Sequence, residues 1–125
     1  MRLYLAAAFA RRRELVRYAQ ALRLLGHVVE TAWVDTLCED DDALTPEQLR
    51  GWALKDREEI AAADCVVHFT GYGDRGGRHV ELGLALGLGV RSIVVGPREH
   101  VFHYLEDIPR CEDVLDLLLY LGRAA

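Results

Sequence analysis

The chain has 125 residues, of which 51% are hydrophobic and 28% charged, as in an ordinary folded domain. Its formal net charge of −5 opposes binding to nucleic acid or to an anionic membrane surface, because both need a basic field. We therefore expect a single domain over residues 1–125, with a small-molecule partner and neither nucleic acid nor membrane as a partner.

The cysteines and the N-terminus indicate the cellular compartment. The three cysteines are far apart and form no C-x-x-C pair, which is typical of a reduced protein without a disulfide framework or a zinc site. The N-terminus lacks a signal-peptide pattern, and no segment approaches membrane-spanning length. We therefore expect a cytoplasmic protein. The cysteines are Cys38, Cys65 and Cys111.

Strand and helix patterns alternate along the chain. Thr45, Pro46 and Gln48 form a capping box that begins one of the helices. The first strand is rich in alanine and can end as early as Leu5. In chain order the expected elements are a strand over 3–9, a helix over 10–25, a strand over 27–34, an acidic loop over 35–44, a helix over 45–63, a strand over 65–69, a glycine turn over 71–77, a helix over 80–89, a strand over 90–95, a loop or short helix over 98–105, a strand over 108–111 and a helix over 112–123.

This alternation predicts a parallel sheet with helices on both faces. The expected fold class is therefore α/β: a flavodoxin-like or Rossmann-like three-layer sandwich with four or five parallel strands. Ligands of such folds bind beyond the carboxyl ends of the strands. Tyr4, the turn after Phe69 and the loop after Val95 can meet at that edge, whereas Asp56 requires its helix to lean over it.

The stretch over 64–89 combines a strand, a glycine turn and a helix. Four glycines fall within residues 71–77, where they allow the backbone to approach a ligand closely. Glu81 follows in the first turn of the expected helix, where unpaired N–H groups and the helix dipole favour a carboxylate. By itself, such an acid is more simply interpreted as favouring its own helix dipole.

The glycine turn also resembles a dinucleotide-binding motif. Gly71, Gly73 and Gly76 have the G-x-G-x-x-G spacing, but this motif belongs after the first strand of a fold. The next strand ends in Gly96 and Pro97, without the acid that binds a ribose. We therefore expect no nicotinamide cofactor and no other cofactor. No metal is expected either, because the acidic loop lacks the spaced ligands of a calcium site.

Three positions form an ordered set: Tyr4 in the first strand, Asp56 eight residues before the strand that begins with Ala-Asp, and Glu81 opening the helix. This order resembles the nucleoside 2-deoxyribosyltransferase family and the related nucleoside 5′-monophosphate N-hydrolases. The resemblance covers roughly residues 2–105. Its most specific part is residues 76–83, which read GGRHVELG.

The resemblance implies roles for these three residues. In that family the glutamate of the ELG motif attacks C1′ of a ribose or deoxyribose and displaces the base, giving a covalent glycosyl-enzyme. Glu81 would be the nucleophile, Asp56 the acid or base that helps the base leave, and Tyr4 the residue that holds Glu81. Two carboxyls in a retaining reaction should lie about 5–5.5 Å apart. Without the resemblance, Asp56 is more simply interpreted as a solvated residue on a helix surface, and Tyr4 as a core residue.

The resemblance also implies a substrate-binding group and a shared site. His103, after the fourth strand, corresponds to a residue that a neighbouring subunit contributes near the sugar 5′ group, so a homo-oligomer, a dimer or larger, is expected. The alternative for His103 is a surface histidine in a loop. The expected substrate-binding residues are Gly71, Asp74, Gly76, Gly77, Arg78, His79 and His103.

The sequence departs from the family pattern at two places. Residues 75–78 replace the Asp-x-Gly-Thr of the transferases, and residues 6–10 lack the glycine and serine with which the hydrolases bind phosphate. Three functions therefore stay open: transfer of a (deoxy)ribosyl group between bases, hydrolysis of a nucleoside 5′-monophosphate, and nucleotide binding without catalysis. Arginines that can contact a phosphate, or can be solvated surface, are Arg11, Arg12, Arg75 and Arg78.

Overall fold

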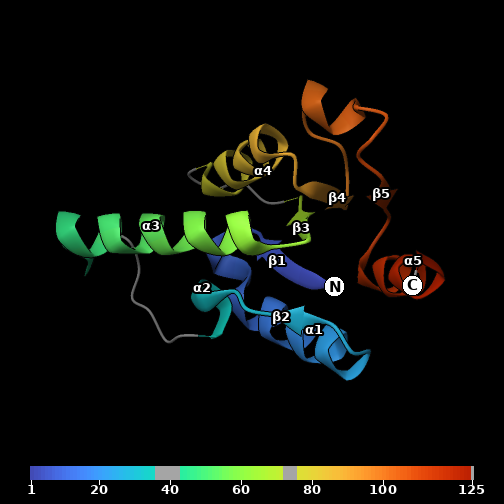
Figure 1. Cartoon of the computed structure of the whole chain (residues 1–125), viewed down its shortest axis with the longest axis horizontal. Helices are drawn as coiled ribbons and strands as arrows, with labels where there is room; N and C mark the ends of the chain where they lie inside the picture. The colour runs from blue at the N-terminus through green and yellow to red at the C-terminus, as the bar shows by residue number, and fades with distance from the viewer. Residues whose placement is uncertain (36–42, 72–75, 125) are drawn as a thin grey trace.

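The computed structural model describes residues 1–35, 43–71 and 76–124, and within them five parallel strands form one sheet in the order β2-β1-β3-β4-β5 (Figure 1). This order is that of flavodoxin-like folds, so the expected α/β architecture is confirmed. The strands are β1 (Arg2–Ala6), β2 (Val28–Val29), β3 (Cys65–Phe69), β4 (Arg91–Val95) and β5 (Arg110–Cys111).

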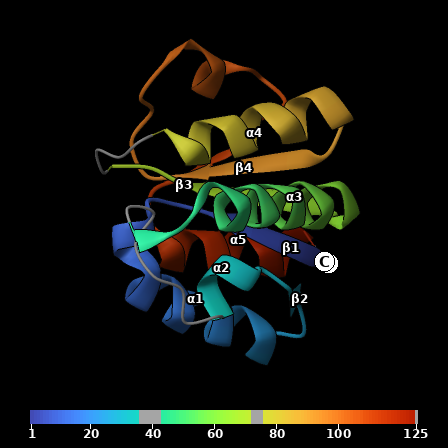
Figure 2. The ribbon, with the colours of Figure 1, turned by 90° about the vertical axis from the view of Figure 1, so that its left-hand side faces the viewer.

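Helices cover both faces of this sheet. The third and fourth helices lie side by side on one face, and the first and fifth lie on the other (Figures 1 and 2). Among the described residues, no helix combines the length and the apolar content needed to span a bilayer. The helices are α1 (Arg12–Leu24), α2 (Ala32–Asp35), α3 (Pro46–Ala62), α4 (Gly77–Leu88) and α5 (Val114–Ala124), with short 3₁₀ helices η1 (Phe9–Arg11) and η3 (Val101–Tyr104).

The core lies on both sides of the central strands β1 and β3. Every residue of β3 is buried, as expected for a central parallel strand covered by helices on both faces. Tyr4 and Phe69 are the largest of the fully buried side chains. Tyr4 therefore belongs to the core through its ring, and only its hydroxyl is left to serve a polar site.

Helix α3 begins at the predicted capping box and extends past the sheet. The Thr45 hydroxyl accepts a bond from the Gln48 N–H, and the Gln48 side chain accepts one from the Thr45 N–H. Ile60, near the end of α3, is wholly buried, whereas Leu49 and Leu54 are 38% and 43% exposed. The first half of α3 projects beyond the strands (Figure 1), which explains this exposure and brings its middle over the sheet edge.

The predicted strand over 27–34 is wrong in most of its length. Pairing with β1 stops at Val29, and residues 32–35 are helical. The Thr31 hydroxyl accepts a bond from the Leu5 N–H at 3.1 Å, and the Trp33 indole N–H donates to the Leu5 carbonyl at 2.9 Å. Side chains thus satisfy the backbone groups of β1 that a longer second strand would have used. Most of the acidic loop over 35–44 lies outside the described residues.

Candidate active site

Strand β1 and helices α3 and α4 bring Tyr4, Asp56 and Glu81 together. The Tyr4 hydroxyl donates a hydrogen bond to the carboxyl group of Glu81, although the two residues are 77 positions apart. Asp56 lies close enough to interact electrostatically with the same hydroxyl. One phenol from the sheet therefore faces two carboxyl groups that come from two adjacent helices.

Tyr4 is a neutral hydrogen-bond donor in this arrangement. The residue is 1% exposed, and burial raises the pKa of its phenol far above the usual range. The negative charges of Glu81 and then Asp56 raise this pKa further. The hydroxyl therefore keeps its proton at every physiological pH and holds Glu81 in place.

Asp56 has the properties of a proton donor or acceptor near neutral pH. Burial, with the Glu59 charge adding to it, raises the pKa of Asp56 to about 6, while hydrogen bonding by Tyr4 and the charge of Lys55 act in the opposite direction. Its Oδ1 atom is buried and has no hydrogen-bond partner in the described part of the chain. Within those residues it also forms no ion pair with Lys55 or Arg57, so the solvated-surface interpretation is wrong.

The position of Glu81 in its helix differs from the prediction. Gly76 caps α4 with a positive φ of +91°, and the helix begins at Gly77 rather than at Val80. Glu81 therefore lies beyond the first turn, and no acid occupies that turn. The interpretation of Glu81 as a first-turn acid stabilised by the helix dipole is wrong, and its contact with Tyr4 replaces that interpretation.

The predicted substrate-binding residues flank the glycine turn. The structure places Gly71 at the end of β3 and Gly76, Gly77, Arg78 and His79 at the start of α4. It describes neither Asp74 nor Arg75. Binding of substrate by this group stays a prediction.

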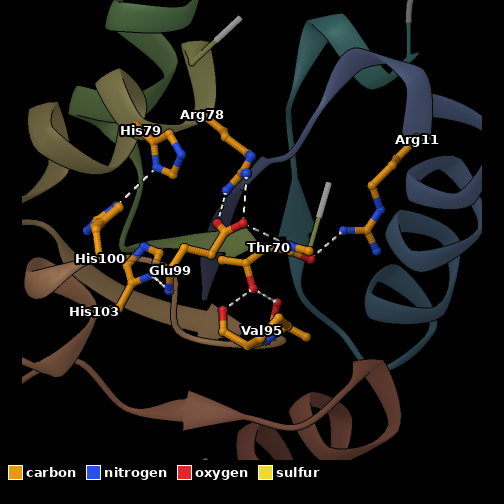
Figure 3. Close-up of polar contacts among 10 residues, drawn as sticks. Arg11, Thr70, Arg78, His79, Val95, Glu99, His100 and His103 are labelled. Atoms are coloured by element: carbon orange, nitrogen blue, oxygen red, sulfur yellow. Dashed lines mark hydrogen bonds and ion pairs between the residues drawn. The ribbon is translucent and has the colours of Figure 1, made fainter. Parts of the chain in front are cut away.

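Arg78 and Glu99 connect the start of α4 to the loop after β4 (Figure 3). The Arg78 side chain is 3% exposed and contacts both carboxylate oxygens of Glu99. Partial burial by itself would raise the pKa of Glu99, but the hydrogen bonds and charge of Arg78 outweigh it, so the pKa is lowered. The Gly71 N–H donates to the same carboxylate at 3.4 Å, so Glu99 fixes both ends of the glycine turn.

Thr70 provides a second connection between the two loops (Figure 3). Its hydroxyl donates to the Pro97 carbonyl at 2.6 Å, and its N–H donates to the Val95 carbonyl at 2.9 Å. Arg11 donates to the Thr70 carbonyl at 3.0 Å from the other side, and also forms an ion pair with Glu14. The carboxyl ends of β3 and β4 are thereby held together.

His103 lies inside its own chain. The residue is 0% exposed, so the alternative of a surface histidine is wrong. Its Nδ1 accepts a bond from the Glu99 N–H at 3.0 Å, and its ring centroid lies 3.8 Å from that of His100 (Figure 3). A contribution of His103 to a neighbouring subunit stays a prediction.

Sequence reasoning missed Glu99, His68 and His100. No short motif contains Glu99, whose role depends on a partner 21 residues away. The sequence held one sign of this group: His68 stands in an otherwise apolar, buried strand, where a histidine usually has a specific role.

The sheet order and this arrangement define a class: flavodoxin-like α/β proteins in which two acidic side chains face the hydroxyl of one buried tyrosine at the carboxyl edge of the sheet.

No protein-family model matches the sequence, and neither does any curated protein. Solved structures do match. A 2-deoxyribosyltransferase from Bacillus psychrosaccharolyticus is 25% identical, with a TM-score of 0.75 over 94% of this chain and 90% of that one.

Two further structures share the fold. A conserved protein from Enterococcus faecalis V583 is 16% identical, with a TM-score of 0.72 over 100% of this chain and 99% of its own. The CMP N-glycosidase BcmB from Clostridium botulinum is 20% identical, with a TM-score of 0.63 over 98% and 99% of the two chains. These two likenesses show the fold alone. The similarity to the 2-deoxyribosyltransferase confirms the resemblance that the motifs indicated.

Proposed function

We propose that this protein is an enzyme that cleaves the N-glycosidic bond of a nucleoside or nucleotide. The observation that supports this most directly is the hydrogen bond from the buried, neutral Tyr4 to Glu81, with Asp56 beside the same hydroxyl. A carboxyl group held by a fixed donor and a second one with a pKa of about 6 suit the two chemical roles of a retaining glycosidase. Similarity to a 2-deoxyribosyltransferase adds independent support.

In the proposed reaction a carboxylate oxygen of Glu81 attacks C1′ of the sugar. The C1′–N bond breaks, its electron pair stays on the base, and protonated Asp56 gives the base a proton. The resulting glycosyl ester on Glu81 is then attacked by a second base or by water, whose proton returns to Asp56. Tyr4 keeps its proton throughout and orients Glu81.

Transfer to a second base is the first choice for the overall reaction, because the similarity at 25% identity is to a deoxyribosyltransferase. Hydrolysis of a nucleoside 5′-monophosphate is the second, and the likeness in fold to a CMP N-glycosidase favours it. Substrate would contact the glycine turn and the start of α4, at Gly71, Asp74, Gly76, Gly77, Arg78 and His79. A nucleotide-binding module without catalysis is the remaining alternative.

The test is incubation with deoxynucleosides, ribonucleosides and their 5′-monophosphates, with and without a second base, followed by chromatography of the free bases. We expect release or exchange of base, and a loss of about 10³-fold or more in Glu81→Ala, because no nucleophile remains. Glu58→Ala, which removes an exposed acid from α3, is the matched control and should keep full activity.

The outcomes separate the alternatives. Exchange of the base indicates transfer, and release from monophosphates alone indicates the hydrolase. Measurable nucleotide binding with neither release nor exchange would contradict an enzymatic function and favour the binding module. A glycosyl mass increment on the wild-type protein that is absent from Glu81→Ala would support the covalent intermediate.

A further inference from the structure

Four of the five histidines of the chain gather where α4 approaches the loop after β4, and Figure 3 shows three of them, His79, His100 and His103. His68 comes from β3, His79 from the first turn of α4, and His100 and His103 from the start and the body of η3. Ring centroids are 5.1 Å apart for His68 and His103, and 4.8 Å apart for His79 and His100. We name these four residues the histidine cluster.

The nitrogen atoms of the histidine cluster are spaced for a metal ion. One ring nitrogen from each of His68, His79 and His103 lies within 4.8 Å of the other two. Two imidazole ligands of a tetrahedral zinc ion, each about 2.0–2.1 Å from the metal, have nitrogens about 3.3 Å apart. Nδ1 of His79 and Nε2 of His100 are 3.1 Å apart, so this pair already has the required separation. The pairs among His68, His79 and His103 need to close by at most about 1.5 Å.

Three members of the histidine cluster have buried nitrogens without a partner. Both ring nitrogens of His68, Nδ1 of His100 and Nε2 of His103 make no hydrogen bond to any described residue. The side chains of His68 and His103 are 0% exposed. Leaving a polar atom buried and unpaired costs about 1–3 kcal/mol, so natural proteins rarely keep several of them side by side without a ligand.

The charge state of the histidine cluster favours a cation over an anion. The rings of His68 and His103 are fully buried, where an unpaired charge is costly, so they offer lone pairs rather than positive charge. The charge of the adjacent Arg78 is balanced by Glu99, so a phosphate would find little net attraction.

We propose that His68, His79 and His103 bind one divalent transition-metal ion of the zinc type, with His100 as the fourth ligand. Neutral imidazole is a preferred ligand of zinc, nickel and copper, whereas calcium and magnesium prefer oxygen. Four protein ligands leave no open position, so the ion is structural. It joins β3, the start of α4 and η3 and takes no part in breaking the glycosidic bond, and His79 would then bind the ion rather than contact the substrate.

Metal binding changes one backbone contact. Because Nδ1 of His103 accepts a hydrogen bond from the Glu99 N–H, the proton of the neutral ring lies on Nε2. Ligation through Nε2 requires that proton on Nδ1, so the Glu99 amide loses its acceptor. The Glu99 amide resonance is therefore a local reporter of metal binding at this site.

The test uses the full chain without an affinity tag, stripped with a chelator and dialysed against micromolar Zn²⁺. We expect one bound zinc per chain by elemental analysis, a rise of several degrees in Tm, and a shift of the Glu99 amide resonance. His79→Ala and His100→Ala are made separately, so that one folded variant suffices, and each should weaken zinc binding at least tenfold. His27→Ala removes the histidine beside the N-terminus and should bind zinc like the wild type.

Two results would overturn the proposal. One is a protein that binds no zinc and shows no change in Tm across the micromolar range. The other is zinc binding that His79→Ala and His27→Ala alter equally, which indicates adventitious surface binding. None of these measurements uses a nucleoside, so their failure leaves the proposed glycosidic function untouched.

Discussion

Asp56 is the residue at which the fold and the proposed chemistry conflict most clearly. Its carboxyl group is largely buried near Glu59, and it shares the Tyr4 hydroxyl with Glu81. Its pKa rises to about 6. An acid that protonates a leaving base near neutral pH needs such a value, whereas a stable fold does not. We therefore expect this position to lower stability in exchange for reactivity.

Replacing Asp56 with Asn tests this conflict. Folding raises the pKa of Asp56 from 3.8 to about 6, so its contribution to stability is fully present below pH 3.8 and is lost as the pH rises through about 6. Asp56→Asn should therefore raise the free energy of unfolding at pH 8 by about 1–2 kcal/mol, after allowance for partial exposure, and should give no such gain at pH 3.8 or below.

Urea unfolding of the two proteins at pH 3.8 and pH 8 measures this difference. The same variant should release base more slowly, because the amide has no proton to give. A stability gain of equal size at both pH values would contradict the assignment, since the effect would then not depend on titration of the carboxyl group.

At the scale of single elements, the loop after β4 is fixed by close packing at Gly96. The backbone there has a φ of +111°, and a Cβ atom would lie 2.6 Å from the Thr70 hydroxyl oxygen and 3.1 Å from its carbonyl oxygen. Gly26, after α1, has a φ of +94° but nothing within 4 Å of such an atom. The two glycines share a backbone conformation that residues with a Cβ atom rarely adopt, and they differ in the space available to such an atom.

Alanine substitutions at the two glycines should therefore differ. Gly26→Ala should cost about 1 kcal/mol from backbone strain alone. Gly96→Ala should cost about 3 kcal/mol or more, because it also displaces the Thr70 hydroxyl from the Pro97 carbonyl. Chemical denaturation gives both values. Equal losses would show that the contact between the β3 and β4 loops contributes little.

How much of each element the sequence predicts depends on how local its cause is. The capping box of α3 and the apolar run of β3 have local causes, and both predictions hold. The second strand was predicted too long because Thr31 and Trp33 bond to the backbone of β1, which no pattern within 27–34 reveals. The start of α4 depends on the left-handed conformation of Gly76, one of four glycines in the turn.

At the scale of the whole molecule, the sequence predicted the three residues of the candidate site but not the residues that surround it. Tyr4, Asp56 and Glu81 follow from spacing and resemblance, and the structure brings them together. The histidine cluster was missed because its members lie on three elements that approach one another only when β3 and β4 pair. Side-chain proximity of this kind requires the complete topology.

Self-association is a property of the whole molecule that the resemblance predicts. The η3 segment presents large apolar side chains to solvent: Val101 is 75%, Phe102 57% and Tyr104 68% exposed. We expect sedimentation velocity to show a dimer or larger species, and Phe102→Asp to shift it toward monomer. Leu24→Asp, at a residue of α1 that is 88% exposed, should leave association unchanged. A wild-type protein that stays monomeric at high concentration would contradict the prediction.

Because Asp56 and Glu81 stand on neighbouring helices, the gap between their acidic groups depends on how α3 and α4 pack. Replacing small residues by larger ones along that helix–helix seam would widen the gap without altering either acid. Evolution, or an engineer, can thus adjust whether a water molecule fits between the two groups. The choice between a solvent molecule and a second base as the acceptor then becomes a matter of helix spacing.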